Sequence, residues 1–364
     1  MPIKVLDISF YHNPISSRPY AEIFIGLQKA GVEVSVMARG DTYYAKRFAE
    51  NGLNVIDFQI SKKFSLKAIR LIRNEIRKNN IQVLQLGSSK GIINGLFAAM
   101  GLKVKVVLYR GYTGNIHWYD PSAYLKFLHP RVDRILCIAE ATRDHIRQNM
   151  LFNRQKAITI RKGHDPAWYA EIVAADLSEF GIGKGDFSAI CVANVRPMKD
   201  IPNLIRATRY LPSNMPFHLF LVGNGMEAPE IQQEIQASPF KDHIHLTGFR
   251  KDVLEIVKAC DVFTLASIKG EAITKAVIEA MSLASTPIIT DIPGNKALVK
   301  DGEHGLVVPP KDPQAMAAAI VKLWENQELC KRYGQNAQKH IQTNFHIEQS
   351  IRETHQMYKE LVEE

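Results

Sequence analysis

Short apolar runs of strand length alternate with segments of helical period along almost the whole chain. This alternation is typical of parallel βαβ units, so it predicts the α/β class with doubly wound sheets. The clearest helical segment is Leu66–Asn79, where Ile69, Ile72 and Ile76 recur at helical spacing. In the first half of the chain, the expected strands are Lys4–Ser9, Val32–Ala38, Val55–Phe58, Val83–Leu86, Lys105–Tyr109, Arg134–Ile138 and Ala157–Arg161.

A less periodic stretch divides this pattern into two sets. Residues 166–186 contain Gly, Pro and Asp, and we expect the hinge between two domains there. The 364 residues are enough for an N-terminal domain over 1–165 and a second domain over 187–345. We expect a C-terminal helix, 348–364, to pack back on the first domain. The strands expected in the second set are Ser188–Asn194, His218–Val222, Ile244–Leu246, Val262–Leu265, Pro287–Thr290 and Gly305–Val308.

Composition excludes several classes of protein. With 46% apolar and 23% charged residues, the chain has the balance of a soluble protein with a large core, not of a disordered one. We find no secretory signal and no apolar run of the ~20 residues that a membrane-spanning helix needs, so we expect a cytoplasmic protein. Four isolated cysteines are expected to be buried, reduced thiols; they are Cys137, Cys191, Cys260 and Cys330.

Charge is unevenly distributed along the chain. Residues 1–175 hold 26 Lys and Arg against 13 Asp and Glu, whereas residues 176–364 hold 20 against 24. The basic half indicates an anionic partner. The segment Lys62–Lys78 carries much of this charge on one helix, which is either a solvated face or a peripheral contact with anionic lipid. Nucleic acid is not expected, because we find no recognition-helix motif or basic strand interleaved with aromatic residues.

Ligands of doubly wound sheets bind beyond the carboxyl ends of the strands, so loops that follow strands are examined first. Glu271 falls in such a loop, and Thr274 can cap a helix whose second turn carries Glu279. The N–H groups at this helix start suit a diphosphate, and the two carboxylates suit sugar and ribose hydroxyls. The alternative is that both glutamates merely solvate a loop and a helix.

Two further loops follow strands of the second set. Arg196 and Lys199 come after Ser188–Asn194, where a guanidinium and an ammonium can meet phosphate oxygens. Gly223 and Gly225 lie between a strand and a helix. Taken alone, the first segment is more often a solvated loop, and the second is more often a plain turn.

Together, these segments resemble the family 4 retaining glycosyltransferases, which have the GT-B fold. The resemblance is strongest over residues 188–323 and implies two Rossmann-like domains that face each other across a cleft. The motifs that carry it are Arg196 and Lys199, Leu221-Val-Gly-Asn-Gly225, Leu246-Thr-Gly-Phe249, Ala259-Cys-Asp-Val-Phe263, Glu271-x7-Glu279 and Asp301-Gly-Glu-His-Gly-Leu-Val-Val-Pro309.

The resemblance implies roles for individual residues. Glu271 would contact the transferred sugar, and Arg196 with Lys199 would neutralise the diphosphate leaving group. No metal and no cofactor is implied; the co-substrate would be a UDP- or GDP-sugar. The residues implied in donor binding are Glu279 at the ribose, the backbone of Ala272, Ile273 and Thr274 at the diphosphate, Gly248 and Phe249 at the base, and Gly223 with Gly225.

The acceptor side is expected in the loop that follows Lys105–Tyr109, because polar groups gather there at the carboxyl end of a strand. Its candidate acceptor residues are Arg110, Asn115, His117 and Asp120. Either His117 or Asp120 would assist the acceptor proton, and a histidine that is simply satisfied within its loop is the alternative.

The function expected is retaining transfer of a hexosyl unit from a nucleotide sugar to a hydroxyl of a glycan or a lipid-linked acceptor. Such transfer belongs to cell-surface polysaccharide or glycolipid biosynthesis, in the cytoplasm or peripherally on the inner face of the membrane. The alternatives are a sugar-nucleotide epimerase, a non-catalytic partner subunit and a sugar-binding receptor. Departures from the family pattern sustain the partner subunit: Asn194 stands where the family has Arg, and Glu271-Ala-Ile-Thr274 replaces Glu-Gly-Phe-Gly.

Overall fold

The computed structural model describes residues 2–114 and 116–364. The chain forms two compact units: unit 1 comprises Met1–His164 with Phe345–Glu364, and unit 2 comprises Asp165–Asn344. Residues 166–186, where the sequence predicts a hinge, fall within unit 2. The hinge itself stays a prediction.

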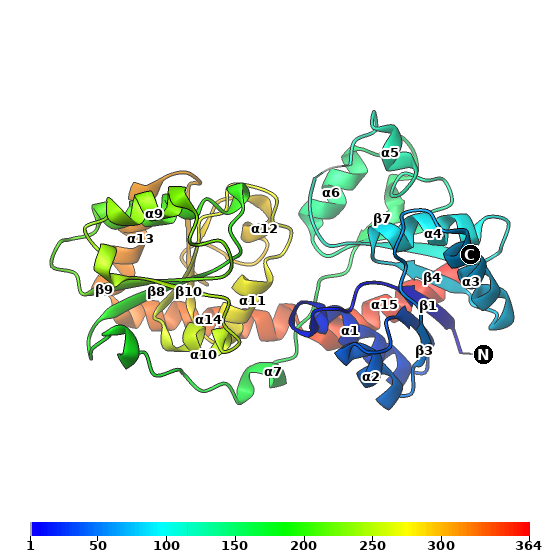
Figure 1. The fold of residues 1–364 in the computed structure, drawn as a ribbon, viewed down its shortest axis with the longest axis horizontal. Coiled ribbons are helices and arrows are strands. Elements are labelled where there is room, and N and C mark those ends of the chain that lie inside the picture. The colour runs from blue at the N-terminus through cyan, green and yellow to red at the C-terminus, as the bar shows by residue number, and fades with distance from the viewer. Residues whose placement is uncertain (1, 115) are drawn as a thin grey trace. The chain divides into compact units, whose positions relative to one another are not determined.

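Unit 1 is built on a seven-stranded parallel sheet with the strand order β3-β2-β1-β4-β5-β6-β7. The central strand β1 pairs on both sides, since Val5 lies opposite Val34 of β2 and Val83 of β4. Figure 1 shows helices on both faces of this sheet. Its strands are β1 (Lys4–Ile8), β2 (Glu33–Ala38), β3 (Asn54–Asp57), β4 (Val83–Leu86), β5 (Lys105–Arg110), β6 (Arg134–Cys137) and β7 (Ala157–Thr159).

Among the described residues, six helices of unit 1 begin at residues whose side chains accept from helix N–H groups, namely Asn13, Thr42, Ser65, Ser88, Asp120 and His346. The helix α3 buries Ile72 and Ile76 of the predicted series together with Ala68, whereas Ile69 is only half-buried. The helices of unit 1 are α1 (Pro14–Lys29), α2 (Tyr43–Glu50), α3 (Leu66–Lys78), α4 (Ser89–Ala99), α5 (Pro121–Tyr124), α6 (Glu140–Gln148) and α15 (Ile347–Glu363).

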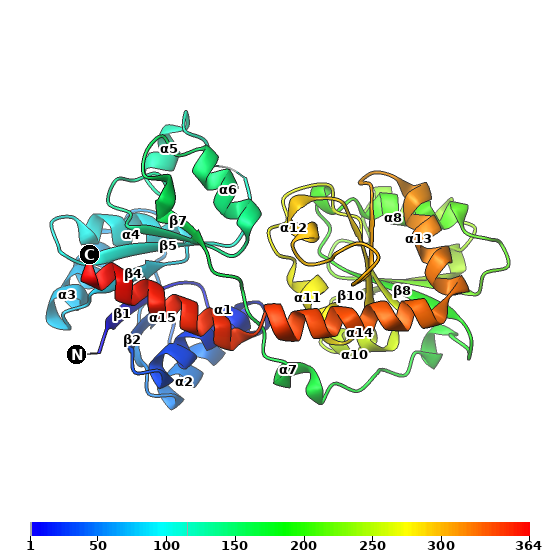
Figure 2. The same cartoon turned by 180° about the vertical axis from the view of Figure 1, so that it is seen from behind.

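The C-terminal helix α15 completes unit 1, which confirms the predicted return of the chain (Figure 2). It packs so tightly on α1 that a Cβ atom added at Gly26 would lie 2.2 Å from Cδ1 of Ile351. The hydroxyl of Tyr358 also donates to Oε1 of Gln85 on β4 at 2.6 Å. A larger residue at position 26 would therefore force the side chain of Ile351 to shift, and glycine avoids this.

Unit 2 is built on a six-stranded parallel sheet with the order β10-β9-β8-β11-β12-β13. Its strands are β8 (Phe187–Val192), β9 (Phe217–Val222), β10 (Ile244–Gly248), β11 (Val262–Leu265), β12 (Thr286–Thr290) and β13 (Leu306–Val308). Its helices are α7 (Ala167–Ala170), α8 (Ile201–Ala207), α9 (Pro229–Gln236), α10 (Val253–Ala259), α11 (Lys275–Ser282), α12 (Pro293–Lys296), α13 (Pro313–Glu325) and α14 (Gln327–Asn344).

The predicted α/β class with two doubly wound parallel sheets is confirmed. All four cysteines are free and buried, as expected. The edge strand β7 is shorter than predicted and ends at Thr159, although the amide of Ile160 still donates to Cys137. Among the described residues, no helix has both the length and the apolar character needed to cross a membrane.

Candidate functional site

An ion pair joins two of the predicted site residues. Lys199 lies in the short 3-10 helix η3 (Pro197–Lys199) after β8, and Glu271 lies in the loop between β11 and α11. Nζ of Lys199 is 2.5 Å from Oε1 of Glu271, and the two side chains are only 15% and 11% exposed. The carboxylate also accepts hydrogen bonds of 3.0 Å from the hydroxyls of Ser267 and Thr274. Three donors therefore hold one largely buried carboxylate.

The loops that carry these two residues pack against each other. The amide of Ile268 donates to the carbonyl of Met198 at 2.8 Å. Gly270 has a φ of +80°, and a Cβ atom there would lie 2.4 Å from Cε of Met198. Glycine thus allows both the left-handed backbone and the close approach. This contact between two loops that the sequence places 72 residues apart brings Lys199 to Glu271.

A buried network beyond β12 supports the Glu271 loop. The hydroxyl of Thr290 donates to the carbonyl of Ser267, and Nδ2 of Asn295 donates to the carbonyl of Thr290 at 3.0 Å. Gly294 lies directly behind the loop, because a Cβ atom there would meet the carbonyl oxygen of Glu271 at 2.2 Å. The sequence analysis missed these supporting residues. Their position at the carboxyl ends of β11 and β12 was the signal that could have found them.

The start of α11 differs in one detail from the prediction. Thr274 occupies the N-cap position, but its side chain makes no cap hydrogen bond and donates instead to Glu271. A charged acceptor within reach explains the difference, because hydrogen bonds to ionised groups are stronger than neutral ones. The amide of Val277 donates to the carbonyl of Thr274 at 3.1 Å, while the N–H groups ahead of it precede the hydrogen-bond ladder of the helix, as at any helix start. Ala272, Ile273 and Thr274 are buried at this end.

Two further charged candidates lie beside this centre. Glu279, in the second turn of α11, forms an i,i+4 ion pair with Lys275 and has a side chain only 14% exposed. Arg196 is exposed. Within residues 2–114 and 116–364, no hydrogen bond or ion pair of its guanidinium is found, so the group can meet an anion. The assignment of both residues to the donor stays a prediction.

The glycine turns are packed against the loop after β8. Gly223 has a φ of +138°, a Cβ atom there would lie 2.0 Å from the carbonyl oxygen of Ala193, and its amide donates to the carbonyl of Gly248 at 2.9 Å. The side chain of Asn194 accepts from the amide of Asn224 at 3.1 Å. Asn194 therefore braces the glycine turn from a position where the family pattern has a cation.

Two other predicted donor residues differ in their surroundings. Gly225 has a φ of +86° and lies close to Val195, whose Cβ atom would be 3.1 Å from a Cβ atom at Gly225. Phe249, which follows Gly248, is 59% exposed and presents its ring to solvent. An exposed ring next to a backbone turn is available to stack on a planar group.

Among the described residues, no group of three or more His, Cys, Asp or Glu is arranged to hold a metal ion. Burial raises the pKa of the Cys191 thiol to about 12, so the thiol beneath the Lys199 loop stays protonated. Transfer without a metal stays a prediction.

The predicted acceptor loop of unit 1 is held together by Arg110. This side chain is buried, its Nε donates to the carbonyl of Tyr112 at 2.9 Å, and its Nη2 donates to the carbonyl of Gly114. Its guanidinium carbon lies 3.5 Å from the centre of the Tyr112 ring and 4.8 Å from that of Phe127. Desolvation lowers the pKa of Arg110. The residue therefore organises its own loop.

The other acceptor candidates have mixed surroundings. The ring of His117 stacks on that of Tyr119 with 5.1 Å between centroids. Asp120 caps α5 by accepting from the amide of Ser122 at 2.8 Å. Asn115 lies outside the described residues. The structure brings these groups to one loop, and their contact with an acceptor stays a prediction.

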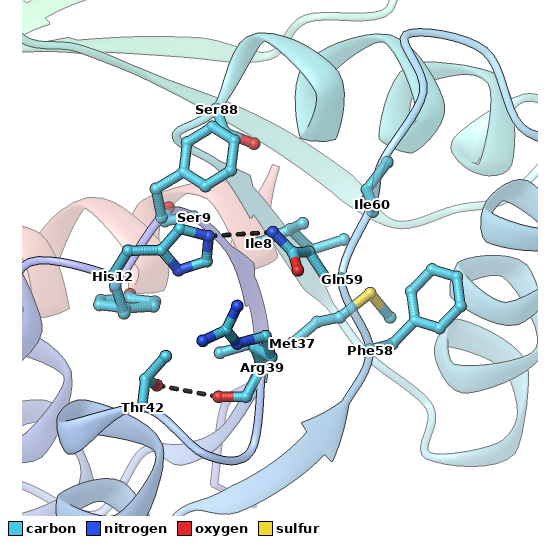
Figure 3. A pocket seen from close by; sticks show the side chains of 13 residues that line it. Ile8, Ser9, His12, Met37, Arg39, Thr42, Phe58, Gln59, Ile60 and Ser88 are labelled. Carbon is cyan, nitrogen blue, oxygen red and sulfur yellow. Dashed lines mark hydrogen bonds between the residues drawn. The ribbon is translucent and has the colours of Figure 1, made fainter.

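A pocket that the sequence analysis did not assign lies beyond the carboxyl ends of β1, β2 and β3 (Figure 3). Its cavity measures only about 20 Å³. Nε2 of His12 lies 3.0 Å from Nε2 of Gln59 at its rim, and Arg39 and Ser88 also line it. Its position at the carboxyl ends of strands is the one that favours a ligand.

A buried carboxyl lies behind the wall of this pocket. Asp7 of β1 accepts from the hydroxyl of Tyr11 at 2.6 Å and from that of Tyr20 at 2.8 Å. Burial raises the pKa of the Asp7 carboxyl from 3.8 to about 7, and these hydrogen bonds only partly oppose the rise. Nε2 of Gln85 donates to the Tyr20 hydroxyl at 2.9 Å, so the cluster continues to Tyr358 of α15.

Comparisons with known proteins find similarity to glycosyltransferases. Residues 174–340 match the family described as Glycosyl transferases group 1, and residues 20–168 match Glycosyltransferase Family 4. Uncharacterized glycosyltransferase MJ1069 of Methanocaldococcus jannaschii is 25% identical over 68% of this chain and 63% of its own length. UDP-Gal:alpha-D-GlcNAc-diphosphoundecaprenol alpha-1,3-galactosyltransferase of Escherichia coli is 25% identical over 63% of this chain and 60% of its own length.

Solved structures share the whole fold. Anabaena Alr3699/HepE, in complex with UDP and glucose, has a TM-score of 0.80 and covers 98% of this chain and 100% of its own, with 17% sequence identity. Both curated relatives are longer than their matched regions, and the chain spans less than two thirds of either one.

Proposed function

Because the chain belongs to glycosyltransferase family 4 and has the GT-B fold, we propose that it transfers a sugar from a nucleotide diphosphate sugar to an acceptor hydroxyl. The observation that carries this proposal is the Lys199–Glu271 pair, held by two hydroxyls at the start of α11. A cation for phosphate, a carboxylate for sugar hydroxyls and free helix N–H groups are thereby within one loop cluster.

In the proposed reaction, the bond between the anomeric carbon and the β-phosphate oxygen breaks as the acceptor oxygen attacks from the same face. Because attack and departure occur on the same face, the sugar retains its configuration. The acceptor proton passes to the leaving phosphate oxygen. Lys199, Arg196 and the N–H groups of residues 272–274 stabilise the charge that develops on the diphosphate. Glu271 accepts hydrogen bonds from the donor sugar and holds it for attack.

The donor is proposed to be a UDP- or GDP-sugar. Glu279 would exchange its ion pair with Lys275 for the ribose hydroxyls, and the ring of Phe249, beside Gly248, would border the base. UDP is the first nucleotide to test, because Anabaena Alr3699/HepE, which shares the fold, was solved with UDP and glucose. A hexosyl unit is proposed for the same reason.

The acceptor is proposed to be a glycan or lipid-linked sugar of cell-surface polysaccharide or glycolipid biosynthesis. The Escherichia coli relative, whose printed name specifies a diphosphoundecaprenol-linked acceptor, supports this class. His117 and Asp120 of the acceptor loop are the proposed contacts. A lipid-linked acceptor would place the chain at the inner face of the cytoplasmic membrane.

Nucleotide release from a panel of UDP-, GDP-, ADP- and dTDP-sugars tests the proposal. We expect slow hydrolysis of one donor, faster turnover with acceptor, and calorimetric binding of the matching free diphosphate. Glu271→Gln should lose about a hundredfold in turnover, the cost of removing one preorganised contact to the transition state. Glu227→Gln, an exposed change in the same unit, is the matched control. Full activity of Glu271→Gln would contradict the assigned role.

A non-catalytic partner subunit is the second candidate. It is favoured by Asn194, which braces the glycine turn where the family pattern has a cation. This candidate predicts that no diphosphate binds across the panel even at millimolar concentration. A sugar-nucleotide epimerase would instead convert one donor into its epimer without any acceptor, and product analysis on the same panel would reveal it.

A further inference from the structure

An exposed apolar pocket lies on unit 1, in addition to the pocket beyond β1. We define the amino-edge patch as the apolar residues that line its mouth: Tyr124, Leu128, Pro130, Leu151 and Phe152. Phe152 is 79% exposed and Leu151 57%, while Phe127, Val132 and Met150 form a buried floor. The cavity measures about 360 Å³. Exposed large apolar side chains gathered around one hollow indicate an interaction surface.

The patch lies at the opposite edge of the sheet from the candidate chemistry. Residues 128–132 immediately precede β6, and residues 150–156 immediately precede β7. Both segments are therefore at the amino ends of parallel strands, whereas ligands of such sheets bind at the carboxyl ends. The patch is thus placed to attach the protein to something without occupying the acceptor loop.

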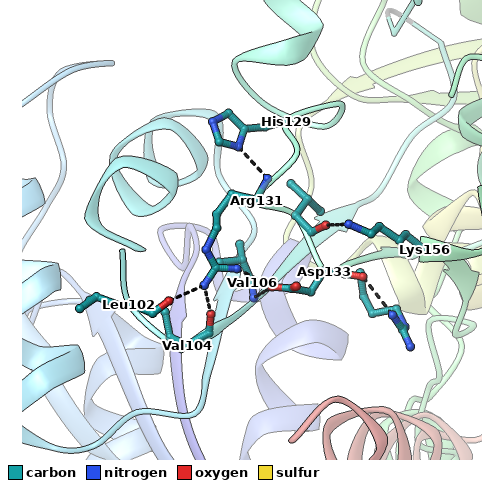
Figure 4. Close-up of polar contacts among 9 residues, drawn as sticks. Leu102, Val104, Val106, His129, Arg131, Asp133 and Lys156 are labelled. Atoms are coloured by element: carbon teal, nitrogen blue, oxygen red, sulfur yellow. Dashed lines mark hydrogen bonds and ion pairs between the residues drawn. The ribbon is translucent and has the colours of Figure 1, made fainter. Parts of the chain in front are cut away.

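Hydrogen bonds and an ion pair hold the turn that carries Pro130 of the patch (Figure 4). Arg131 donates to the carbonyls of Leu102 and Val104 and forms a 2.8 Å ion pair with Asp133. Oδ2 of Asp133 also accepts from the amide of Val106 at 2.7 Å, so the turn before β6 is tied to the turn before β5. An apolar surface that is held in place loses little conformational freedom on binding.

Charge selects the partner. The described residues that line the cavity include Lys156 and no Asp or Glu, and Lys126 and Arg154 lie within two residues of the patch in the chain. Among the described residues, no ion pair is found for these three cations, whereas the nearby Asp133 is neutralised by Arg131. Residues 1–175 carry twice as many cations as anions, 26 against 13. A partner that complements this surface therefore offers an apolar layer to the exposed side chains and anionic groups to the three cations.

We propose that the amino-edge patch docks the chain on the surface of a membrane that contains anionic phospholipid. Phe152 and Leu151 enter the boundary between headgroups and acyl chains, Tyr124 lies at the headgroup level, and the three cations meet lipid phosphates. This inference rests on the proposed function only for its purpose, which is access to a lipid-linked acceptor. Membrane docking through the patch can therefore occur whether or not the protein transfers a sugar.

Flotation with vesicles tests the inference on the full chain. Vesicles of phosphatidylcholine alone are compared with vesicles that also contain phosphatidylglycerol. We expect binding to the anionic vesicles. Leu151→Ser combined with Phe152→Ser should lower the affinity at least about tenfold, because the two apolar side chains that the lipid would bury are lost. Lys126→Glu combined with Arg154→Glu should also weaken binding, and added salt should mimic that loss. Tyr210→Ser, at a half-exposed tyrosine of unit 2, is the matched control.

Three outcomes would overturn the inference. The first is absence of vesicle binding by the unaltered chain. The second is loss of binding in Lys67→Glu combined with Arg70→Glu on α3 while the patch variants still bind, which would move the contact to the basic helix. The third is a change in oligomeric state of the patch variants without vesicles, which would make a second copy the occupant. Binding of nucleotide diphosphate, measured in the same variants, reports on the proposed function separately.

Discussion

The costs of breaking the Lys199–Glu271 pair from its two sides should not add up in the double variant. In Lys199→Met, the Glu271 carboxylate stays largely buried with only the hydroxyls of Ser267 and Thr274 as donors. Loss of one partner of a buried pair costs about 3 to 5 kcal/mol. The remaining hydroxyls and the 11–15% exposure place this case at about 3 kcal/mol.

Glu271→Gln leaves Lys199 with a neutral acceptor and should cost about 2 kcal/mol. The double variant has no unpaired charge, so its cost should be about 3 kcal/mol rather than the sum. The coupling energy of the cycle is then about 2 kcal/mol. Lys269→Met, an exposed lysine on the same loop as Glu271, should be close to neutral and is the matched control.

The assay is urea unfolding of unit 2, followed by the fluorescence of Trp324. This residue packs against the core of unit 2, and the chain's other two tryptophans, Trp118 and Trp168, are replaced by phenylalanine to isolate its signal. Free energies that add within about 0.5 kcal/mol would refute the reasoning, since independent sites behave that way. So would a Lys199→Met chain as stable as the parent.

Three further predictions follow from the packing and the pKa values. Gly294→Ala should lower donor turnover more than tenfold, because its Cβ atom would lie 2.2 Å from the carbonyl oxygen of Glu271 and would displace that loop. Gly183→Ala is the control and should not lower turnover, since its Cβ atom would lie 3.5 Å from Oδ2 of Asp186, an ordinary contact distance. Asp7 has a folded-state pKa of about 7, raised from 3.8. Its ionisation should therefore lower the free energy of unfolding of unit 1, measured in urea, by about 3 kcal/mol between about pH 5 and pH 8. Asp7→Asn should abolish this pH dependence. Burial beside two other histidines lowers the pKa of His245 to about 4. The free energy of unfolding of unit 2 should therefore fall by about 1 to 2 kcal/mol as the pH drops from 6.5 to 4, a figure that allows for the partial exposure of His245. His245→Asn should flatten that pH dependence.

The fold was largely predictable because its signal is periodic. Each parallel strand of the two sheets is a short apolar run between turn residues, and α3 shows its buried face as Ala68, Ile72 and Ile76. Strand ends were less predictable, since β7 ends at Thr159 where an edge strand has one neighbour. Periodicity reports which side of an element is buried, not where its last hydrogen bond lies.

The candidate site was predicted as separate residues and not as an assembly. Lys199 and Glu271 were identified on their own loops, while the Ile268–Met198 hydrogen bond that joins the loops has no sequence signature. The supporting role of Asn295 depends on a three-dimensional contact with Thr290. Arg110 was predicted as an acceptor contact because a cation in a polar loop suggests a ligand. The sequence could not indicate that its guanidinium lies over the rings of Tyr112 and Phe127.

The return of α15 to unit 1 has a consequence for synthesis on the ribosome. Residues 1–164 form a sheet whose Gln85 obtains its Tyr358 partner only after unit 2 has been translated. The unit that emerges first is therefore the one completed last, and unit 2 can fold while its predecessor still exposes the α1 surface around Gly26. A chain released before residue 347 would carry a complete second unit and an incomplete first one, exposed to chaperones and proteases.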